Sequence, residues 1–238
     1  MTDMRPMPLR FLITAGPCHE PIDRVRFLGN RSSGKMGIAI ADHACRLGYD
    51  VTLLLGPTHL APLEKNVLLK RYESTADLDL LLQSSLEACD VLIMAAAVAD
   101  YRPVKHTPAP AKIERSPGTL RLELESTPDL VAGCAVRKRP DQTIVAFALE
   151  STEVLRERAL SKLKRKKVDM IVANPLETMD SDTISAIIFD RASSVNEQSI
   201  NAPVEITKSA FAEWLIERIL TYRTASSPYP TGDAIETQ

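Results

Sequence analysis

The sequence predicts an α/β protein with a doubly wound, mainly parallel sheet. Short runs that are apolar throughout alternate with amphipathic helical patterns along most of the 238 residues. Strands that are apolar on both sides belong in a parallel sheet with helices on both faces, because that arrangement buries them completely. The ligand of such a sheet binds beyond the carboxyl ends of its strands. We therefore expect the loops after Ala15, Ala97 and Asn174 to lie together at one edge.

Hydrophobic periodicity predicts the individual elements in order. The helix over 35–48 has apolar residues at spacings of three and four and ends at Gly48, and Ser74 or Thr75 can cap a helix over 77–87. The remaining expected elements are strands at 10–15, 50–56, 66–72, 90–99, 143–150, 168–174 and 183–190, and helices at 152–167 and 207–222. Together they form a Rossmann-like arrangement.

Two segments break this alternation. Residues 16–33 form a long strand-to-helix connection, and residues 101–127 join a proline-rich, cationic stretch to the alternating sequence LRLELE. We interpret 101–127 as a flap or hairpin that stands off the sheet, because long loops at the ligand edge are more often functional than decorative. No repeat or internal boundary is visible, so we expect one domain over 1–222 and a disordered tail over 223–238.

Composition limits the classes of function. Charged residues make up 25% and hydrophobic residues 45%, as in ordinary globular proteins, and the formal net charge of −2 indicates neither a nucleic-acid nor a membrane partner. The four cysteines and four histidines are scattered, so neither a protein-held metal site nor a disulfide framework is predicted. The first residues lack the apolar core of a signal peptide, and we expect a cytoplasmic protein.

The stretch GNRSSGKM at 29–36 resembles a P-loop, but it differs in two respects. Met36 stands where a P-loop has its magnesium-binding hydroxyl, and Gly29 lies far beyond the preceding strand end at Ala15. The helix that follows still offers free N–H groups and a partial positive charge, which suit an anion. Ser32, Ser33, Gly34 and Lys35 therefore form a candidate phosphate site. Spacing alone equally allows a simple cap on a surface helix.

A nicotinamide-binding domain is the obvious rival. It requires G-x-G-x-x-G at the first turn and an acidic residue at the end of the second strand. The first turn here reads AGPCHE, and the second strand ends LLLGPTH without a carboxylate. Both signatures are missing, so this class is disfavoured.

Longer motifs resemble a particular family of ligases. The run ITAGPCHEPIDRVRFLGNRSSGKMG at 13–37 is similar to the signature of phosphopantothenoylcysteine synthetase, approximately ITAGGTxEPIDxVRxIxNxSSGKMG. Further matches follow in the same order: AAAVADYRP at 95–103, KI at 112–113, STPDLVA at 126–132, VAFALES at 145–151 and KLKRKKVDMIVAN at 162–174. The resemblance extends from Phe11 to Ile188, and it favours the phosphate-site interpretation of 32–35.

The resemblance implies a two-step ligation in coenzyme A biosynthesis. The family activates the carboxylate of 4′-phosphopantothenate with a nucleoside triphosphate, giving an acyl-nucleotide and pyrophosphate. The amine of cysteine then attacks the acyl-nucleotide and releases the nucleoside monophosphate. The motif spelling is similar to that of bacterial members, which implies CTP rather than ATP, magnesium and a homodimer. The family's bacterial form is often fused to a decarboxylase, whereas the resemblance here implies the stand-alone ligase.

The resemblance also implies roles for individual residues. Asn30 would stabilise the acyl-nucleotide and Lys112 would act in the second step, while Arg26 would bind phosphopantothenate. Residues implied at the nucleotide are Ser32, Ser33, Gly34, Lys35, Ala96, Asp100, Lys112, Pro128, Asp129, Leu130, Val131, Phe147, Lys162 and Lys166. Without the resemblance the same side chains have plain interpretations: a loop cap for Asn30, solvated lysines, a core phenylalanine, and an ion pair of Arg26 with Glu20 or Asp23.

Several positions depart from the family pattern. Pro17, Cys18 and His19 replace the usual G-T run, Pro175-Leu176 follows VAN, Asp182 stands in place of an asparagine, and the flap reads ER instead of KK. We expect Cys18 to be a small buried residue, since the ligation requires no thiol nucleophile. The departures motivate an alternative, a non-catalytic nucleotide-binding relative that acts as a sensor or partner subunit and binds CTP without turnover.

Overall fold

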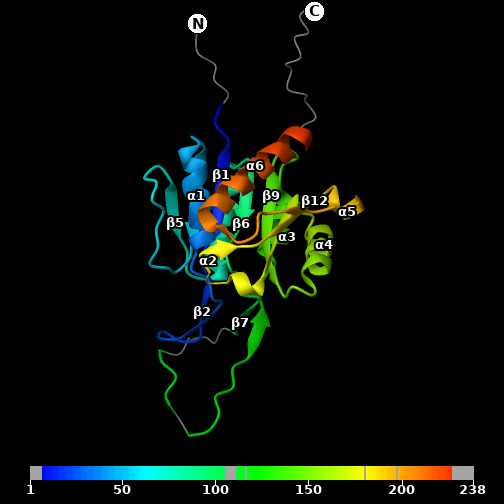
Figure 1. The fold of residues 1–238 in the computed structure, drawn as a ribbon. Coiled ribbons are helices and arrows are strands. Elements are labelled where there is room, and N and C mark those ends of the chain that lie inside the picture. Colours follow the sequence, from blue (N-terminus) through cyan, green and yellow to red (C-terminus); the bar gives the residue numbers. More distant parts are fainter. Residues whose placement is uncertain (1–6, 105–110, 116, 180, 197, 227–238) are drawn as a thin grey trace, which may run out of the picture.

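The computed structural model has the expected α/β architecture, a central sheet with helices on both faces (Figure 1). It describes residues 7–104, 111–115, 117–179, 181–196 and 198–226. The eight strands of the main sheet are, in spatial order, β13 (Ile200–Asn201), β12 (Ile187–Asp190), β10 (Met170–Pro175), β9 (Thr143–Glu150), β6 (Val91–Met94), β1 (Arg10–Ala15), β4 (Asp50–Leu55) and β5 (Leu68–Arg71). Neighbours from β10 to β5 pair in parallel, whereas β12 pairs antiparallel with both β10 and β13.

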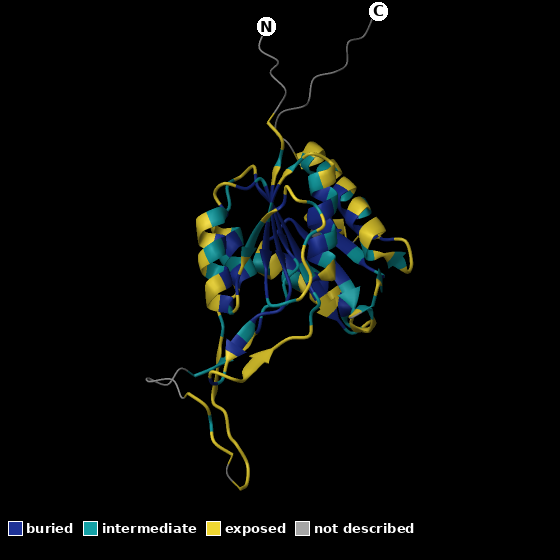
Figure 2. Cartoon of the chain, turned by 90° about the vertical axis from the view of Figure 1, so that its left-hand side faces the viewer, coloured by how far each residue is buried: buried dark blue, intermediate teal, exposed yellow. Residues whose placement is uncertain are grey.

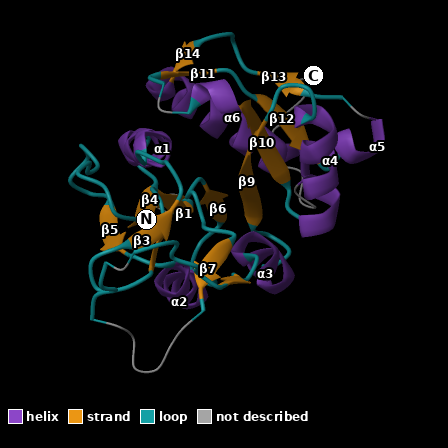
Figure 3. Ribbon diagram, turned by 90° about the horizontal axis from the view of Figure 1, so that it is seen from below, coloured by secondary structure: helices purple, strands orange, loops and turns teal. Residues whose placement is uncertain are grey.

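Helices cover both faces of this sheet (Figure 3). They are α1 (Lys35–Arg46), α2 (Thr75–Ser85), α3 (Leu130–Arg137), α4 (Leu155–Lys166), the short α5 (Ser193–Asn196), α6 (Lys208–Ser226) and a 3-10 turn η1 (Leu176–Thr178). On one face, Ile40 of α1 packs in a single cluster with Phe211 and Leu215 of α6. On the other face, Leu78 of α2 and Leu163 of α4 belong to a second cluster. Figure 2 shows the buried residues concentrated between these layers.

The order of the strands fixes where a ligand can enter. The chain adds β4 and β5 on one side of β1, then crosses over and adds β6, β9 and β10 on the other side. The order therefore reverses between β1 and β6, and loops that leave these strands diverge and open a crevice. The loops after Ala15 and Met94 are tied together there, since the Ala97 N–H donates to the Gly16 carbonyl at 2.9 Å.

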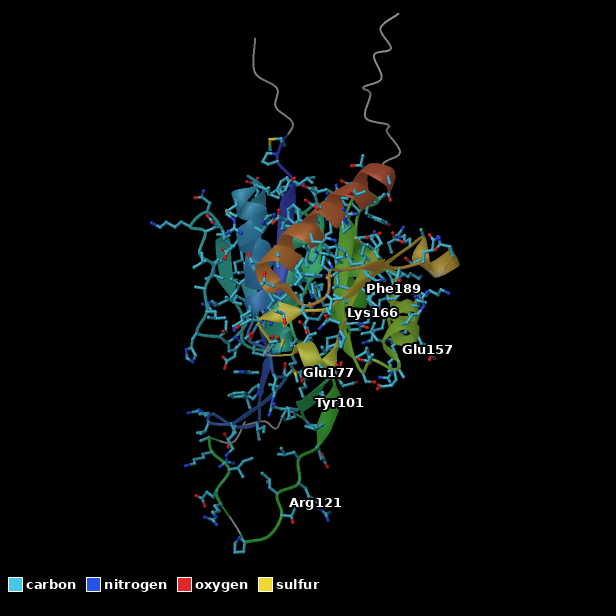
Figure 4. All side chains as sticks on the ribbon, viewed as in Figure 1. Tyr101, Arg121, Glu157, Lys166, Glu177 and Phe189 are labelled. Atoms are coloured by element: carbon cyan, nitrogen blue, oxygen red, sulfur yellow. The ribbon has the colours of Figure 1, made fainter. Side chains whose placement is uncertain are left out.

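The two long segments each contain a small hairpin. Residues 16–33 form β2 (His19–Pro21) and β3 (Phe27–Gly29), and residues 101–127 begin and end in β7 (Tyr101–Pro103) and β8 (Leu124–Ser126). The described residues between β7 and β8, 111–115 and 117–123, extend away from the body, as expected for a flap (Figure 1). Figure 4 shows Tyr101 at its root and Arg121 far out along it. Residues 105–110 and 116 of the expected flap lie outside the described residues.

Three sequence-based boundaries were wrong. The expected strand at 90–99 is shorter, since β6 spans Val91–Met94. The expected strand at 183–190 is divided, because β11 (Thr183–Ile184) pairs with β14 (Ile206–Thr207) in a separate ribbon before β12 joins the main sheet. The last helix continues to Ser226, beyond the expected end of the domain at 222. Its final turn is held because the Arg223 guanidinium donates to the carbonyl oxygens of Asp90 and Asp141. The rest of the expected tail, 227–238, lies outside the described residues.

Candidate active site

The candidate phosphate loop leads directly into α1. Its helix begins at Lys35, and the preceding Gly34 is the N-cap, with a φ of 78° that favours glycine. The Lys35 N–H donates to Ser33 Oγ at 3.4 Å, so one free amide of the first turn has a partner. A Cβ on Gly37 would lie 2.4 Å from the Ala15 Cβ. The missing side chain therefore lets the start of α1 pack directly on the end of β1.

A cleft of about 620 Å³ lies at this edge of the sheet. The residues that the sequence selects and that line it are Asn30, Ser32, Ser33, Gly34, Lys35, Ala96, Asp100, Val131, Phe147, Lys162 and Lys166. They come from the loop before α1, the loop after β6, and from α3, β9 and α4. The expectation that loops after Ala15, Ala97 and Asn174 meet at one edge is confirmed, since Asn174 and Ala97 line the same cleft.

Asn30 bridges two of these loops. Its Nδ2 donates to the Val98 carbonyl at 2.9 Å, which orients the carboxamide across the cleft. A carboxamide has two N–H donors and an acceptor oxygen. With one donor engaged by Val98, the described contacts leave the oxygen and the second N–H for a ligand.

Three lysines of the cleft are paired with carboxylates. Lys35 Nζ lies 2.6 Å from Asp182 Oδ1, Lys162 Nζ lies 2.6 Å from Glu150 Oε1, and Lys166 Nζ lies 3.1 Å from Asp129 Oδ1. The side-chain hydrogen bond from Lys35 holds the pKa of Asp182 below its ordinary value. Burial alone would raise the pKa of Glu150, but hydrogen bonds from Lys162 and Arg158 outweigh burial and lower it. Burial also opposes the charge on Asp129, but hydrogen bonds from the Ala132 N–H and Lys166 lower its pKa, so all three carboxylates are ionised at neutral pH.

The segment at 128–131 is the start of a helix that the sequence analysis did not predict. Asp129 is the N-cap of α3, and its Oδ1 accepts the Ala132 N–H at 3.1 Å. Leu130 is buried in the core, Pro128 is exposed, and Val131 lines the cleft. An eight-residue helix shows too few turns for its periodicity to be recognised.

Arg26 and Lys112 lie apart from the residues that line the cleft. Arg26 forms an ion pair with Asp23 at 3.4 Å, and its Nη2 donates to the Ile113 carbonyl at 3.0 Å. Lys112 is exposed on the flap between Ala111 and Ile113. The ion pair with Asp23 matches one of the alternatives for Arg26, and its contact with a substrate stays a prediction.

The cleft also has lining residues that the sequence analysis missed. They are Gly29, Arg31, Met36, Gly37, Met94, Ala95, Ala97, Val98, Ala148, Leu149, Asn174, Thr178, Met179, Ile184 and Lys208. Asn174 lies near the end of β10, and the sequence analysis placed the loop after it at the ligand edge without selecting the residue itself. Its Nδ2 donates to Thr178 Oγ1 at 2.8 Å, which joins β10 to the η1 turn. Lys208 lines the cleft only because β11 and β14 bring the start of α6 back to the sheet, and no local pattern predicts that.

Cys18 is buried, as expected. It has no measurable exposure, and burial raises the pKa of its thiol to about 11. The thiol is therefore protonated at neutral pH and unsuited to act as a nucleophile. Cys18 instead belongs to the buried core cluster that also contains Leu54 and Tyr72.

The fold and the cleft define a class: a doubly wound α/β protein with a cleft at the switch point of its sheet, where the first residues of α1 line the cleft. The chain belongs to the family described as the DNA/pantothenate metabolism flavoprotein C-terminal domain, whose model matches residues 8–222. This match supports the family resemblance that the motifs indicate.

Relatives and solved structures agree with this membership. The chain is 39% identical over 219 residues to a cysteine/cysteine sulfinic acid decarboxylase from an unknown prokaryotic organism, covering 89% of this chain and 58% of the relative. It is 42% identical over 165 residues to the coenzyme A biosynthesis bifunctional protein CoaBC of Vibrio cholerae serotype O1, covering 69% and 41%. It thus spans about half the length of these curated relatives. The crystal structure of the C-terminal domain of a CoaBC protein superposes with a TM-score of 0.74 at 36% identity, covering 90% of this chain and 95% of that one.

Proposed function

We propose that the chain is a phosphopantothenate–cysteine ligase of coenzyme A biosynthesis that acts through an acyl-nucleotide. The observation that carries this proposal is one cleft. The ligase resemblance selects residues from distant parts of the sequence, and the fold brings them together in this cleft. They include Asn30, Lys35, Asp100, Phe147 and Lys162. Membership in the family of the CoaBC C-terminal domain supports the same conclusion.

In the first step, a carboxylate oxygen of 4′-phosphopantothenate attacks the α-phosphorus of the nucleotide, and pyrophosphate leaves. Two anions must approach each other, so the site needs fixed positive charge and N–H donors. Lys35, Lys162, Lys166 and the first turn of α1 supply them. Each lysine exchanges its carboxylate partner for a phosphate oxygen, so the site is organised before the nucleotide binds.

In the second step, the cysteine amine attacks the acyl carbonyl, the C–O bond to the nucleotide breaks, and the nucleoside monophosphate leaves with the electron pair. The amine nitrogen loses a proton as the amide forms. Asn30 is suited to hold the carbonyl of the acyl-nucleotide, because Val98 already fixes its orientation. We assign Lys112, from the flap, to this second step, and Arg26 to phosphopantothenate.

We favour CTP over ATP, because the motif spelling resembles that of bacterial ligases. The backbone at Ala96 offers a physical criterion for the base. Its N–H already donates to Thr14 Oγ1 at 3.1 Å, and no described hydrogen bond uses its carbonyl oxygen as an acceptor. An acceptor suits the exocyclic amino group that cytosine and adenine share, and it disfavours uracil.

Magnesium fits this site as a partner of the nucleotide. Among the described residues, no group of three or more His, Cys, Asp or Glu side chains could hold a metal ion. Magnesium commonly takes one or two carboxylates together with substrate phosphates and water. Asp100 lines the cleft, so its carboxylate could complete the shell of an ion brought by the triphosphate. Magnesium would supply charge neutralisation on the leaving pyrophosphate.

We further propose that the protein is a homodimer that works in the cytoplasm as one domain. Apolar side chains are exposed together on the hairpin and the flap: Phe27 is 53%, Tyr101 57%, Leu120 56% and Leu122 42% exposed. β2 and β7 pack against each other, so these residues belong to one end of the molecule. Clustered apolar exposure is typical of a surface that another chain covers. In the described part of the chain, no helix has the length and apolar character needed to span a bilayer.

Pyrophosphate release is the measurement that tests the ligase. Purified protein is incubated with 4′-phosphopantothenate, magnesium and either CTP or ATP, with and without cysteine. We expect cysteine-dependent turnover with CTP, reduced about 10²- to 10³-fold by Lys112→Gln, as is typical when a transition-state donor is lost. Arg121→Gln removes a cation from the same flap and should leave turnover unchanged.

One outcome would contradict the ligase, and another would contradict the role of Lys112. CTP binding without pyrophosphate release would favour the alternative, a non-catalytic relative that acts as a sensor or partner subunit, for which the Lys35–Asp182 ion pair is the motivating observation. Equal rates for Lys112→Gln and wild type would remove Lys112 from the mechanism.

A further inference from the structure

The flap is attached to the body beside its proposed catalytic lysine, and the attachment is built around one buried carboxylate. The side chain of Asp23 has 0% exposure. Its Oδ1 accepts the N–H groups of Val25 at 2.8 Å and Arg26 at 2.7 Å, which closes the turn between β2 and β3. Its Oδ2 accepts the Ile113 N–H at 2.9 Å, across 90 positions of sequence.

Further contacts surround the same point. Arg26 forms an ion pair with Asp23 Oδ2 at 3.4 Å and donates through Nη2 to the Ile113 carbonyl at 3.0 Å. The Arg24 N–H donates to the Ala111 carbonyl at 3.3 Å. Both neighbours of Lys112 are therefore bonded to the turn, while the Lys112 side chain stays exposed.

The charge on Asp23 strengthens this arrangement. The N–H of Ile113 is the largest cause of a lowered pKa for Asp23, and it outweighs the opposing effect of burial, with help from the Val25 and Arg26 N–H groups. The carboxylate is therefore ionised at neutral pH. Hydrogen bonds to an ionised acceptor are stronger than neutral ones, so an otherwise exposed segment of the flap, residues 111–115, has a defined position.

We propose that Asp23 is a positioning residue for Lys112: its carboxylate fixes the Ile113 backbone, and with Arg26 it sets where the flap presents the lysine. This inference rests on the proposed function, because it assigns Lys112 to the attack by cysteine. Asp23 acts through Lys112 and contacts no reacting atom. It links the turn of residues 22–26 to the second step of the reaction.

Asp23→Asn is the discriminating variant. Asparagine has the same shape, and its remaining oxygen can still accept the Val25 and Arg26 N–H groups. Its NH₂ group would then face the Ile113 N–H, donor against donor, so the attachment of the flap is lost while the turn is kept. Glu20→Gln is the matched control. Glu20 is also a buried carboxylate of the same hairpin, but it accepts the Thr75 N–H at 2.7 Å and has no described bond to the flap.

The experiment separates the two steps and adds a structural readout. Single-turnover pyrophosphate release measures acyl-nucleotide formation, and cysteine-dependent nucleoside monophosphate release measures the second step. Hydrogen exchange of the segment 111–115 reports the Ile113 amide. We expect Asp23→Asn to slow the second step about ten- to a hundredfold, as small misplacements do, with the first step within about twofold of wild type. Exchange at Ile113 should become faster in Asp23→Asn but not in Glu20→Gln.

The outcomes distinguish this inference from the proposed function. Wild-type protein without pyrophosphate release would overturn the proposed function, and with it the role of Lys112 that Asp23 is said to support. An active wild type in which Asp23→Asn retains the rate of the second step would overturn the inference alone. Unprotected exchange at Ile113 in the wild type would also overturn it, even if the variant failed to fold.

Discussion

At the residue scale, the cleft presents cations that already have carboxylate partners. Lys35, Lys162 and Lys166 each lie within 3.1 Å of a carboxylate oxygen. In the proposed ligase, an incoming phosphate would displace those partners, so the ion pairs would set the strength of nucleotide binding as well as the position of the lysines. The pairs differ in exposure: the side chain of Asp182 is 85% exposed, whereas that of Glu150 is 8% exposed. Asp182 is thus the partner most easily displaced.

Asp182→Asn tests this competition. The variant keeps the side-chain shape and removes the charge that holds Lys35, so the nucleotide no longer displaces an ion pair. Exposed pairs are worth about 0.2–1 kcal/mol, so we expect the KM for the nucleotide to fall by up to about fivefold. Steady-state kinetics at fixed magnesium measures this. Glu177→Gln removes a nearby carboxylate without a described lysine contact and should leave KM unchanged. A higher KM in Asp182→Asn would instead show that the carboxylate helps to hold the nucleotide and its metal.

Single residues also show what the sequence could and could not reveal. The motif at 32–35 predicted a helix start that presents an anion site, because capping and dipole effects are local. The partners of Arg26 and Lys35 could not be derived, since Ile113 and Asp182 lie far away in sequence and meet them only through the fold. For Arg26, the alternatives included Asp23, which is three residues away and within reach of a local argument.

At the scale of elements, the position of α1 depends on the absence of a side chain at Gly37. The first turn of α1 lies so close to β1 that a Cβ there would come within 2.4 Å of the Ala15 Cβ and 3.0 Å of the Thr14 carbonyl oxygen. Both neighbours belong to a central strand that pairs on both sides, so they have little freedom to move. The helix start that we propose as the phosphate site is thereby fixed to the sheet.

Gly37→Ala tests this packing. Alanine has a higher helix propensity than glycine, so this substitution would stabilise a helix whose surface is open at that position. At Gly37 the added methyl group overpacks the contact with β1, which should lower the free energy of unfolding by about 1–3 kcal/mol and move the start of α1. We expect lower stability in thermal unfolding and weaker nucleotide binding. Gly133→Ala is the matched control, because a Cβ on this helical glycine meets nothing within 4 Å. It should be neutral or stabilising, and equal effects of the two substitutions would contradict the argument.

Elements were predicted correctly where burial gives a strong pattern. Strands β1, β4, β9 and β10 and helix α1 follow from apolar runs and periodicity. The three-residue strands β2 and β3 are too short for a period to show, and the break between β11 and β12 arises because two different strands pair with them. Such pairings depend on residues distant in sequence, so no local rule finds them.

At the scale of the whole molecule, the strand order explains why one cleft collects residues from so many segments. The reversal between β1 and β6 opens the crevice, and the loop before α1 lies on one side of it while β9, β10 and α4 lie on the other. The hairpin β2–β3 and the flap extend from this same end (Figure 1). Their attachment through Asp23 makes them one unit, and that unit carries the exposed apolar side chains.

The exposed apolar side chains of the hairpin and the flap allow a test of the proposed homodimer. Leu120 and Leu122 are exposed on the flap, and burying each apolar side chain at an interface would contribute about 1.5–3 kcal/mol. We expect wild-type protein to be a dimer in light scattering at micromolar concentration, and the double variant Leu120→Asp/Leu122→Asp to be monomeric, because buried unpaired charges are strongly unfavourable. Leu63→Asp is the control, since Leu63 is 83% exposed but lies outside the flap and the hairpin, and this variant should remain dimeric.

A monomeric wild type would disprove the dimer, and a dimeric double variant would place the interface elsewhere. The same variants connect the dimer to activity. If the double variant loses turnover as well as dimerisation, the active site depends on the partner subunit.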